Sequence, residues 1–460
     1  MEEEKGRHPM AKTKKTYDFI DLFAGLGGIR LGFQQALEER NLQGRCVFTS
    51  EIKAAAITAL NFNFPGENIL PTDITAVKSE DIPKFKVLLG GFPCQAFSSA
   101  GARRGFADTR GTLFFEVERI LTDKLRGVDG FLLENVEGLV LHDRASNRDS
   151  EGRTIKIIMK VLRDKLKFNA EYVVLDAADF GVPQRRKRVY IVGCKKRFGR
   201  IDLSFIPQPR VTVGEILEHG KPTLDSEFSR KLLSVYKAQD MVGKSLNDKR
   251  GGVRNFHSWD IDARGTATPE ERELLNAILR ERRKRYWADI IGIVWKDGMP
   301  LTTEQIRSFH DVPHLQEMLD DLCAKKYLRL EYPKNLVVHH EDDGSTWTER
   351  KPVESLPMGY NIITGKLSFE FSAFLDTDRI SHTLVATDMT SIGIVDGDGI
   401  RHLTLREGLR LFGYPETYSL APFEDGPKAT ELGYDLIGNS VCVPVIKAVA
   451  GRLLDTINAQ

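Results

Sequence analysis

A single cysteine in the segment GGFPCQAFSSAG, residues 90–101, is the first candidate for covalent chemistry. Cys94 follows the apolar stretch Lys86–Leu89 and two glycines, a pattern that predicts a buried strand running into a tight loop. In α/β proteins, active sites form at such strand exits. A thiol there can act as a nucleophile, although most free cysteines are small buried hydrophobic residues. The surrounding residues must decide between these two roles.

Two further segments carry polar side chains that could act together with this thiol. LLENVEGL places Glu134 and Asn135 at the end of another apolar stretch. Exits of adjacent parallel strands lie side by side, so we expect Glu134 near Cys94. PQRRKRVYIVG leads into a strand, and its alternation predicts that Gln184, Arg186 and Arg188 share one face. A run of basic residues of this kind is more often a solvated sheet edge than a site.

A glycine-rich loop, DLFAGLGG, ends the first predicted strand. Gly25, Gly27 and Gly28 allow the backbone to approach a ligand closely and to turn into a helix. The dinucleotide pattern G-x-G-x-x-G would need glycine at position 30, where this chain has Arg30. Taken alone, the loop is weak evidence, since many such loops are merely structural.

Two acidic residues after the next strands make a ligand at this loop more specific. Glu51 ends FTSE, where a carboxylate can accept hydrogen bonds from ribose hydroxyls, and Asp73 in PTDIT can accept from an exocyclic amine. Each residue could instead be a solvated helix cap. Together with the glycine loop they suit a nucleoside cofactor without phosphates, and S-adenosylmethionine is such a molecule.

These residues must be positioned by a sheet, and the chain before about residue 204 alternates strands with helices. Mostly apolar strands in repeated β–α–β order predict an α/β fold with a parallel-rich sheet covered by helices on both faces. The expected strands are YDFIDLFAG, RCVFTS, KVLLGG, GFLLENV, AEYVVLDAADFG and RVYIVGC. Residues 1–15 are polar and are expected to form a disordered lead-in.

The regular alternation stops near residue 205 and returns near the C-terminus. Residues 205–375 are irregular and highly charged, whereas 376–460 include a predicted terminal helix, so we expect a core of 16–204 and 376–460 with a domain inserted between them. Within the insert, 301–333 reads as helix, turn, helix and strand, which resembles a winged helix-turn-helix with a groove-binding helix after Pro313. The alternative is a small helical packing unit.

The same insert contains a basic run with aromatic residues, RERRKRYW. Its arginines, Arg280, Arg282 and Arg283, are candidates for phosphate contacts, and a solvated helix face is the other interpretation.

Composition narrows the class of protein. Hydrophobic residues make up 41% and charged residues 28% of the 460-residue chain, and no apolar run reaches the ~18 residues needed to span a membrane. Five cysteines without a C-x-x-C pair argue against a disulfide framework and a zinc site, so no metal is expected and a cytoplasmic setting is favoured. A net charge of +1 means that nucleic acid would be bound through local basic patches.

Taken together, the motifs resemble the DNA (cytosine-5) methyltransferase family of the bacterial, restriction-modification type. DLFAGLGG, GFPCQAFS, ENVEGL, QRRKRVYIVG and GYDLIGNSVCVPV match that family's blocks in order, over roughly residues 16–200 and 376–460. The resemblance implies a Rossmann-like S-adenosylmethionine-dependent core with an inserted, smaller target-recognition domain at 205–375. It also implies a double-stranded DNA substrate and S-adenosylmethionine as the methyl donor. We expect a monomer without membrane association that acts at the nucleoid, and a companion restriction endonuclease is an open expectation.

The resemblance assigns a role to each motif residue. Cys94 would add to carbon 6 of a flipped-out cytosine, Glu134 would act at ring nitrogen 3, and Arg186 and Arg188, with Gln184, would complete the catalytic set. The loop after Cys94 would close over DNA, with DNA contacts from Gln95, Arg103 and Arg104. The residues implied at the cofactor are Phe23, Gly25, Leu26, Gly27, Gly28, Glu51, Ile52, Asp73, Ile74, Gly91, Pro93, Leu113 and Asn439.

Three rival functions remain at this point. A transfer-RNA methyltransferase of the same family is disfavoured by the long insert, and a catalytically inactive DNA-binding subunit is disfavoured by the intact Cys94, Glu134 and Arg186. A nicotinamide oxidoreductase is disfavoured by Arg30.

Overall fold

The computed structural model describes residues 14–67, 69–93, 113–144, 149–294, 298–340, 346–364 and 369–459. The chain divides into two compact units. The first contains residues up to Glu218 together with Thr377–Met389 and Leu403 onwards, and the second contains His219–Asp376 and Thr390–His402. The insert therefore starts at His219 rather than at 205. The segment 390–402, expected to return to the core, belongs to the second unit.

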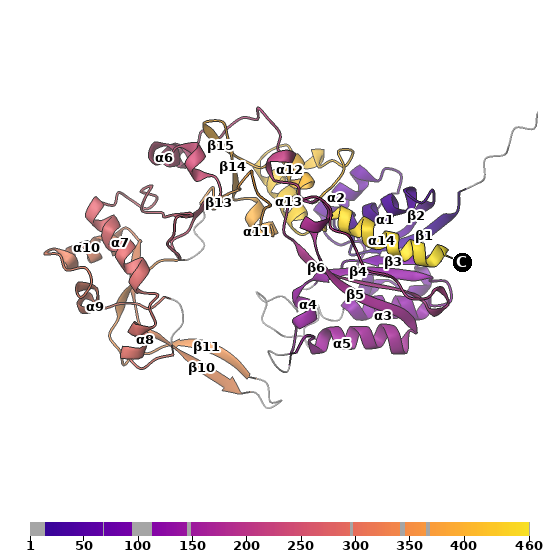
Figure 1. The fold of residues 1–460 in the computed structure, drawn as a ribbon, viewed down its shortest axis with the longest axis horizontal. Coiled ribbons are helices and arrows are strands. Elements are labelled where there is room, and N and C mark those ends of the chain that lie inside the picture. The colour runs from indigo at the N-terminus through magenta and orange to yellow at the C-terminus, as the bar shows by residue number, and fades with distance from the viewer. Residues whose placement is uncertain are drawn as a thin grey trace, which may run out of the picture. The chain divides into compact units, whose positions relative to one another are not determined.

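The first unit is built on a six-stranded sheet of order β2-β1-β3-β4-β6-β5 (Figure 1). Pairs β1–β2, β1–β3 and β3–β4 are parallel, whereas β6 runs antiparallel to both β4 and β5. The expected α/β class and parallel-rich sheet are confirmed, with a reversed sixth strand. The strands are β1 (Thr16–Leu22), β2 (Gln43–Ser50), β3 (Val87–Gly90), β4 (Gly130–Val136), β5 (Phe168–Asp176) and β6 (Lys187–Lys195).

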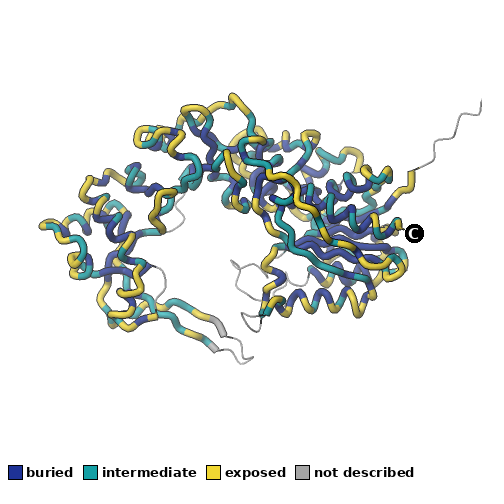
Figure 2. The backbone as a smooth tube through the Cα atoms, in the orientation of Figure 1, coloured by how far each residue is buried: buried dark blue, intermediate teal, exposed yellow. Residues whose placement is uncertain are grey.

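Helices pack on this sheet because their apolar faces match its apolar strands. Strands such as β3 and β4 are buried along almost their whole length, which explains their continuous apolar sequences (Figure 2). The helices of the first unit are α1 (Gly28–Glu38), α2 (Ala54–Asn63), α3 (Leu113–Asp123), α4 (Gly138–Leu141), α5 (Arg153–Lys160), α11 (Ala386–Met389), α12 (Leu405–Arg410), α13 (Pro427–Gly438) and α14 (Val443–Asn458).

The terminal helix α14 completes the core next to the first helix. A Cβ added to Gly32 of α1 would lie 2.7 Å from Ile446, so glycine allows α1 and α14 to approach closely. By length and composition alone, Pro427–Asn458 is apolar enough to cross a membrane, but 72% of its most apolar window is buried inside the protein. This is the environment of a core helix.

The second unit combines short helices with small sheets around its own apolar core. Trp259, Leu274, Ile278 and Leu319 are among its fully buried residues. Its helices are α6 (Glu227–Val235), α7 (Pro269–Glu281), α8 (Tyr286–Ile290), α9 (Thr303–Arg307) and α10 (Leu315–Ala324). Its strands are β7 (Ser245–Leu246), β8 (Asn255–Phe256), β9 (Leu328–Glu331), β10 (Lys334–His340), β11 (Thr346–Pro352), β12 (Gly359–Ile362), β13 (Ala373–Phe374), β14 (Ile392–Asp396) and β15 (Gly399–His402).

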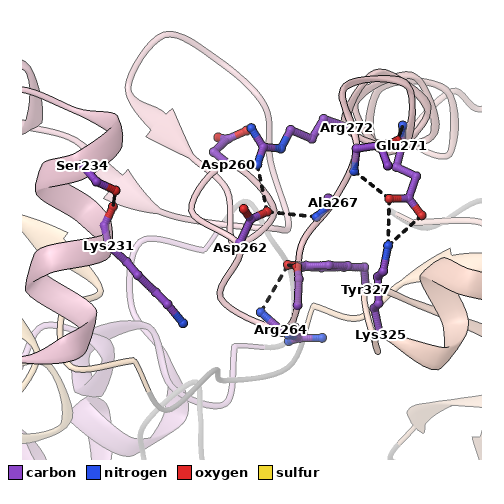
Figure 3. A network of polar contacts seen from close by, with 12 residues as sticks. Lys231, Ser234, Asp260, Asp262, Arg264, Ala267, Glu271, Arg272, Lys325 and Tyr327 are labelled. Atoms are coloured by element: carbon purple, nitrogen blue, oxygen red, sulfur yellow. Dashed lines mark hydrogen bonds and ion pairs between the residues drawn. The ribbon is translucent and has the colours of Figure 1, made fainter.

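Polar contacts fix the start of α7 in this unit (Figure 3). Thr268 and Glu271 form a capping box, and Lys325 donates to both carboxylate oxygens of Glu271 at 3.0 and 2.9 Å. Asp262 accepts from Arg272 and from the Ala267 backbone. Long-range pairs of this kind hold segments that lack regular sheet partners.

The expected order of helix, turn, helix and strand at 301–333 is confirmed by α9, α10 and β9, and the hairpin β10–β11 follows. The exposed side of α10 carries Glu317, Asp320 and Asp321. Because DNA phosphates repel carboxylates, this surface does not favour α10 as a groove-binding helix. Gln316 is also engaged within the unit, since it donates to the Tyr360 hydroxyl at 2.8 Å and accepts from Thr303 at 3.0 Å.

Candidate active site

The exits of β3 and β4 form the centre of the candidate site. Gly90 pairs with Leu133 in the parallel register, so the chain leaving β3 runs beside Glu134. A Cβ added to Gly91 would lie 3.7 Å from Glu134 Oε2, and Asn135 Nδ2 donates to the Phe92 carbonyl at 2.9 Å. These contacts hold Gly91 and Phe92 against the end of β4, and the half-buried Pro93 follows them. Cys94, Gln95, Arg103 and Arg104 lie outside the described residues.

Glu134 is buried and meets one arginine across the sheet. Its Oε1 lies 3.3 Å from Arg188 Nε, and both side chains are nearly enclosed, with exposed fractions of 11% and 13%. The antiparallel β4–β6 register explains the contact, because Val136 faces Arg188 and Glu134 shares its side of the strand two residues away. Burial raises the pKa of Glu134, and this outweighs the opposite effect of Arg188 and Arg186. A carboxyl in this setting can hold or share a proton.

Arg186 occupies a different place from the one expected. It is 3% exposed and donates to the carbonyls of Leu384 at 2.7 Å, Gly438 at 3.2 Å and Ser440 at 2.8 Å. Burial, with the nearby Arg188 charge, lowers its pKa to about 10. Its hydrogen bonds tie the start of β6 to the return segment, so a direct role for Arg186 on a substrate is not supported.

Gln184 is likewise structural. It is fully buried, donates to the Leu411 carbonyl at 3.0 Å and accepts from the Leu384 backbone at 3.1 Å. Residues 184 and 186 precede β6, which begins at Lys187, so strand alternation does not set their directions. The expectation that Gln184, Arg186 and Arg188 share one face stays a prediction. Of these three residues, Arg188 is the one that forms an ion pair with Glu134.

The glycine loop leaves β1 in a sharply turned conformation. Phe23, Gly25 and Gly27 have positive φ angles of 58°, 54° and 69°. A Cβ at Gly25 would meet no atom within 4 Å, whereas one at Gly28 would lie 2.5 Å from the Tyr414 hydroxyl. The loop is thus open at Gly25 and tightly packed behind Gly28, which is how a backbone cradle for a ligand is built.

Glu51 supports this loop from the end of β2. Its Oε2 accepts from the Gly25 backbone at 2.8 Å, and its Oε1 accepts from the backbones of Ile52 and Lys53, each at 2.8 Å. The neighbouring Ile52 is 70% exposed, so its apolar side chain is available for a flat ligand. The Glu51 carboxylate therefore fixes the glycine loop to the end of β2 through the Gly25 backbone.

The structure also describes the other residues that the family resemblance assigns to the cofactor, which are Asp73, Ile74, Leu113 and Asn439. Asp73 is exposed and accepts from the Thr75 backbone and hydroxyl, and these hydrogen bonds lower its pKa. Ile74 is buried, and Leu113 is half-buried at the start of α3. Asn439 follows α13 and donates to Asp435.

Several residues that sequence reasoning did not assign also shape this site. The Tyr418 hydroxyl donates to the Leu26 carbonyl at 2.7 Å, and Tyr414 and Ser440 are joined by a 2.6 Å hydrogen bond. Arg30 is buried, stacks 3.7 Å from the centre of the Phe64 ring and contacts Glu67. In the sequence, the arginine on the apolar face of α1 was the one feature that could have pointed to these residues.

The comparison with protein families covers nearly the whole chain. The profile of C-5 cytosine-specific DNA methylases matches residues 17–455. The chain belongs to this family. It is therefore a DNA (cytosine-5) methyltransferase, as its motifs predicted. Among the residues that the structure describes, no group of three or more His, Cys, Asp or Glu side chains is arranged as a metal site.

Two Type II methyltransferases align over nearly the whole of this chain. Type II methyltransferase M.NlaIV of Neisseria lactamica is 51% identical over 439 residues, covering 95% of this chain and 99% of the relative. Type II methyltransferase M.NgoBV of Neisseria gonorrhoeae is 50% identical with the same coverage. The crystal structure of S. pombe Dnmt2 methyltransferase matches with a TM-score of 0.52 at 16% identity, over 96% of this chain and 99% of its own. That likeness concerns the fold.

Proposed function

We propose that this methyltransferase modifies cytosine within a short DNA recognition sequence through a covalent bond between Cys94 and carbon 6 of the base. The observation that carries the proposal is the buried Glu134 carboxyl, which is paired with Arg188 beside the β3 exit and has a raised pKa. Carbon 5 of cytosine is a poor nucleophile, and thiolate addition at carbon 6 makes it an enamine carbon. Nucleophilic addition of this kind divides one difficult step into easier ones.

Glu134 and Arg188 have complementary tasks in this proposal. Glu134 donates a proton or a strong hydrogen bond to ring nitrogen 3, which drives thiolate addition, and its burial keeps the carboxyl protonated more readily. Arg188 holds Glu134 in place and presents further N–H donors to the base. The target base must leave the duplex stack, which costs about a few kcal/mol. Arg103, Arg104 and Gln95 are proposed to contact the DNA.

The glycine loop fits S-adenosylmethionine. Open space above Gly25, the exposed Ile52 and the carboxylates of Glu51 and Asp73 suit a nucleoside that carries an amino acid rather than phosphates. When bound, this cofactor supplies an electrophilic methyl group. We assign Phe23, Gly25, Leu26, Gly27, Gly28, Glu51, Ile52, Asp73, Ile74, Gly91, Pro93, Leu113 and Asn439 to its pocket.

Sequence recognition is assigned to the second unit, because the first unit's motifs serve chemistry that is the same for every cytosine. The Type II names of the relatives favour a role in protecting cellular DNA from a companion restriction endonuclease. Such a role places the enzyme in the cytoplasm, on chromosomal DNA.

The decisive experiment uses Cys94→Ala and duplex DNA that contains 5-fluorocytosine. The wild-type enzyme is expected to form a denaturation-resistant adduct, because fluorine cannot leave carbon 5 as a proton does, and Cys94→Ala is expected to form none and to lose methyl transfer. Bisulfite sequencing of DNA from cells that express the enzyme identifies the methylated site. Transfer RNA serves as the control substrate. Methylation by Cys94→Ala, or of transfer RNA alone, overturns the proposal.

A further inference from the structure

A basic pocket of about 200 Å³ lies in the second unit, formed by β9, β10, β11, β12 and the segment before β8. Five cationic side chains and one carboxylate line it, so its charge is strongly unbalanced. The charged lining residues are Lys249, Arg282, Arg329, Lys334, Arg350 and Glu331.

The floor of the pocket is ordered and buried. Asn361 is 5% exposed, accepts from Arg282 Nη1 at 2.6 Å and donates to Glu331 Oε1 at 2.6 Å. Arg282 is 3% exposed, and the Met299 backbone donates to its carbonyl at 2.8 Å. The expectation that Arg282 lies on an exposed basic run is therefore wrong, because its guanidinium points into the unit.

The single carboxylate of the pocket, that of Glu331, already has partners for both of its oxygens. Arg329 and Lys334 lie 3.0 and 3.5 Å from Glu331 Oε2, and Asn361 occupies Oε1. Lys249 and Arg350 form no hydrogen bond or ion pair through their side chains with any part of the chain that the structure describes. Two cations thus remain at the rim without a counter-charge.

The loop that carries Lys249 adds to this charge. In the segment KRGGVR, Arg250 and Arg254 are exposed, and Val253 between them is 92% exposed. Asn255 Nδ2 donates to the carbonyls of Arg250 and Gly251 at 3.0 and 3.1 Å, which fixes the loop's shape. A well-formed loop that presents only cations and one apolar tip to solvent is poorly explained by packing alone.

The hairpin β10–β11 presents two of its cations, Lys334 and Arg350, on one face. Arg350 pairs with Leu336, and Lys334 pairs with Pro352, so alternation places Lys334 and Arg350 on the same side of the ladder. The hairpin and the loop 249–254 therefore supply cations from two directions to one pocket.

We propose that this pocket holds a backbone phosphate of duplex DNA and anchors the second unit during recognition, an inference that rests on the proposed function. The unpaired rim offers N–H donors and positive charge, which match phosphate oxygens, and the forked donors of Arg350 suit two oxygens at once. A phosphate contact sets register and orientation without reading sequence. The acidic α10 surface is unsuited to this task.

The test measures binding of a fluorescent duplex of random sequence as salt concentration is varied. The double variant Lys249→Ala/Arg350→Ala is expected to reduce the magnitude of the negative slope of log K against log[salt] by about 0.9, the contribution of one phosphate contact. The methylated site found by bisulfite sequencing is expected to stay the same. Binding to a duplex of random sequence does not depend on methylation. A failure of the proposed function would therefore show itself separately, as an absence of methylation by the wild-type enzyme.

The matched control is Arg230→Ala/Lys237→Ala, which removes one arginine and one lysine from exposed positions of the same unit that line no part of the pocket. Its salt slope is expected to equal that of the wild type. An unchanged slope in the pocket variant, or an equal loss in the control, overturns the proposal. Lys249→Gln, a single exposed change, replaces the double variant if that variant's melting temperature falls.

Discussion

Glu134 and Asp21 are both enclosed carboxyl groups of the first unit, but their surroundings differ. Glu134 has Arg188 at 3.3 Å, whereas neither oxygen of Asp21 has a hydrogen-bond partner among the described residues. Burial raises the pKa of Asp21 to about 7, against the opposing effect of Arg30. The buried carboxyl of Glu134, with a cation beside it, is suited to proton transfer. The buried carboxyl of Asp21, without a hydrogen-bond partner among the described residues, lowers the free energy of unfolding when it is charged.

The first residue-scale prediction concerns Glu134→Gln. This change keeps the shape of the side chain but removes its acidic proton, so the single-turnover methylation rate is expected to fall by about 10²- to 10⁴-fold. DNA affinity should change much less. Glu137→Gln, an exposed change three residues further on, is the control and should keep wild-type rates. Near-normal turnover of Glu134→Gln would remove this residue from the catalytic set.

The second residue-scale prediction concerns pH and Asp21→Asn. Folding raises the pKa of Asp21 from about 3.9 to about 7, so the wild-type free energy of unfolding includes a contribution that is lost as pH rises between these values. At pH 8 the buried carboxylate is charged, and at pH 5 it is neutral. Asp21→Asn should therefore be more stabilising at pH 8 than at pH 5, by about 2.6 kcal/mol.

Thermal unfolding of the two proteins at both pH values measures this difference. Asp18→Asn on the same strand is the control, because Arg45 lowers the pKa of Asp18 and its charge does not change between pH 5 and pH 8. If the Asp21→Asn effect is the same at both pH values, Asp21 is not titrating as described.

At the scale of elements, the start of β6 separates two arginines with different tasks. Arg186 joins β6 to the return segment through three backbone carbonyls, and Arg188 lies beside Glu134. The antiparallel direction of β6 produces this division, since it brings Arg188 opposite Val136 at the exit of β4. The segment from Arg186 into β6 therefore contributes both to the scaffold, through Arg186, and to the candidate active site, through Arg188.

This division predicts opposite outcomes for two substitutions. Arg186→Met leaves three buried carbonyls without donors and should lower the free energy of unfolding by about 3 kcal/mol or more. Arg188→Gln should leave stability nearly unchanged, because Glu134 can become neutral, while the methylation rate falls by about 10²-fold or more. Calorimetry and single-turnover assays on both variants decide the matter. A stable Arg186→Met enzyme with a selective loss of rate would return Arg186 to the catalytic set.

At the scale of the whole molecule, the two units have separate apolar cores. Leu88, Phe131 and Ile191 belong to the core of the first unit, and Trp259 and Leu274 to that of the second. All four tryptophans of the sequence, at positions 259, 287, 295 and 347, fall within the second unit. Tryptophan fluorescence therefore reports on one unit alone.

We predict that S-adenosylmethionine raises the melting temperature of the first unit and leaves the tryptophan-detected transition in place. A ligand at 100 times its Kd stabilises the state that binds it by about 2.7 kcal/mol. Calorimetry follows both units, and fluorescence follows the second. If the fluorescence transition moves as far as the calorimetric one, the two units unfold together.

The order of strands and helices in the first unit, its α/β class and the family motifs were all readable from sequence. These features depend on local patterns: apolar runs that end in glycine, helical periodicity and short polar motifs at strand exits. The sequence predicted that Glu134 lies near Cys94, and the structure places Glu134 beside Gly91 in the loop that leads to Cys94, because parallel neighbours share an exit edge. The placement of the Cys94 thiol stays a prediction.

Only the tertiary structure decided which charged side chains meet. The antiparallel register of β6 selected Arg188 for Glu134 and directed Arg186 to the return segment. Packing enclosed Arg282 within an exposed-looking basic run, and strand pairing drew residues 390–402 into the second unit. These outcomes depend on partners far away in the sequence. A local pattern specifies which residue types are present, whereas the register of distant strands determines which of them become buried and paired.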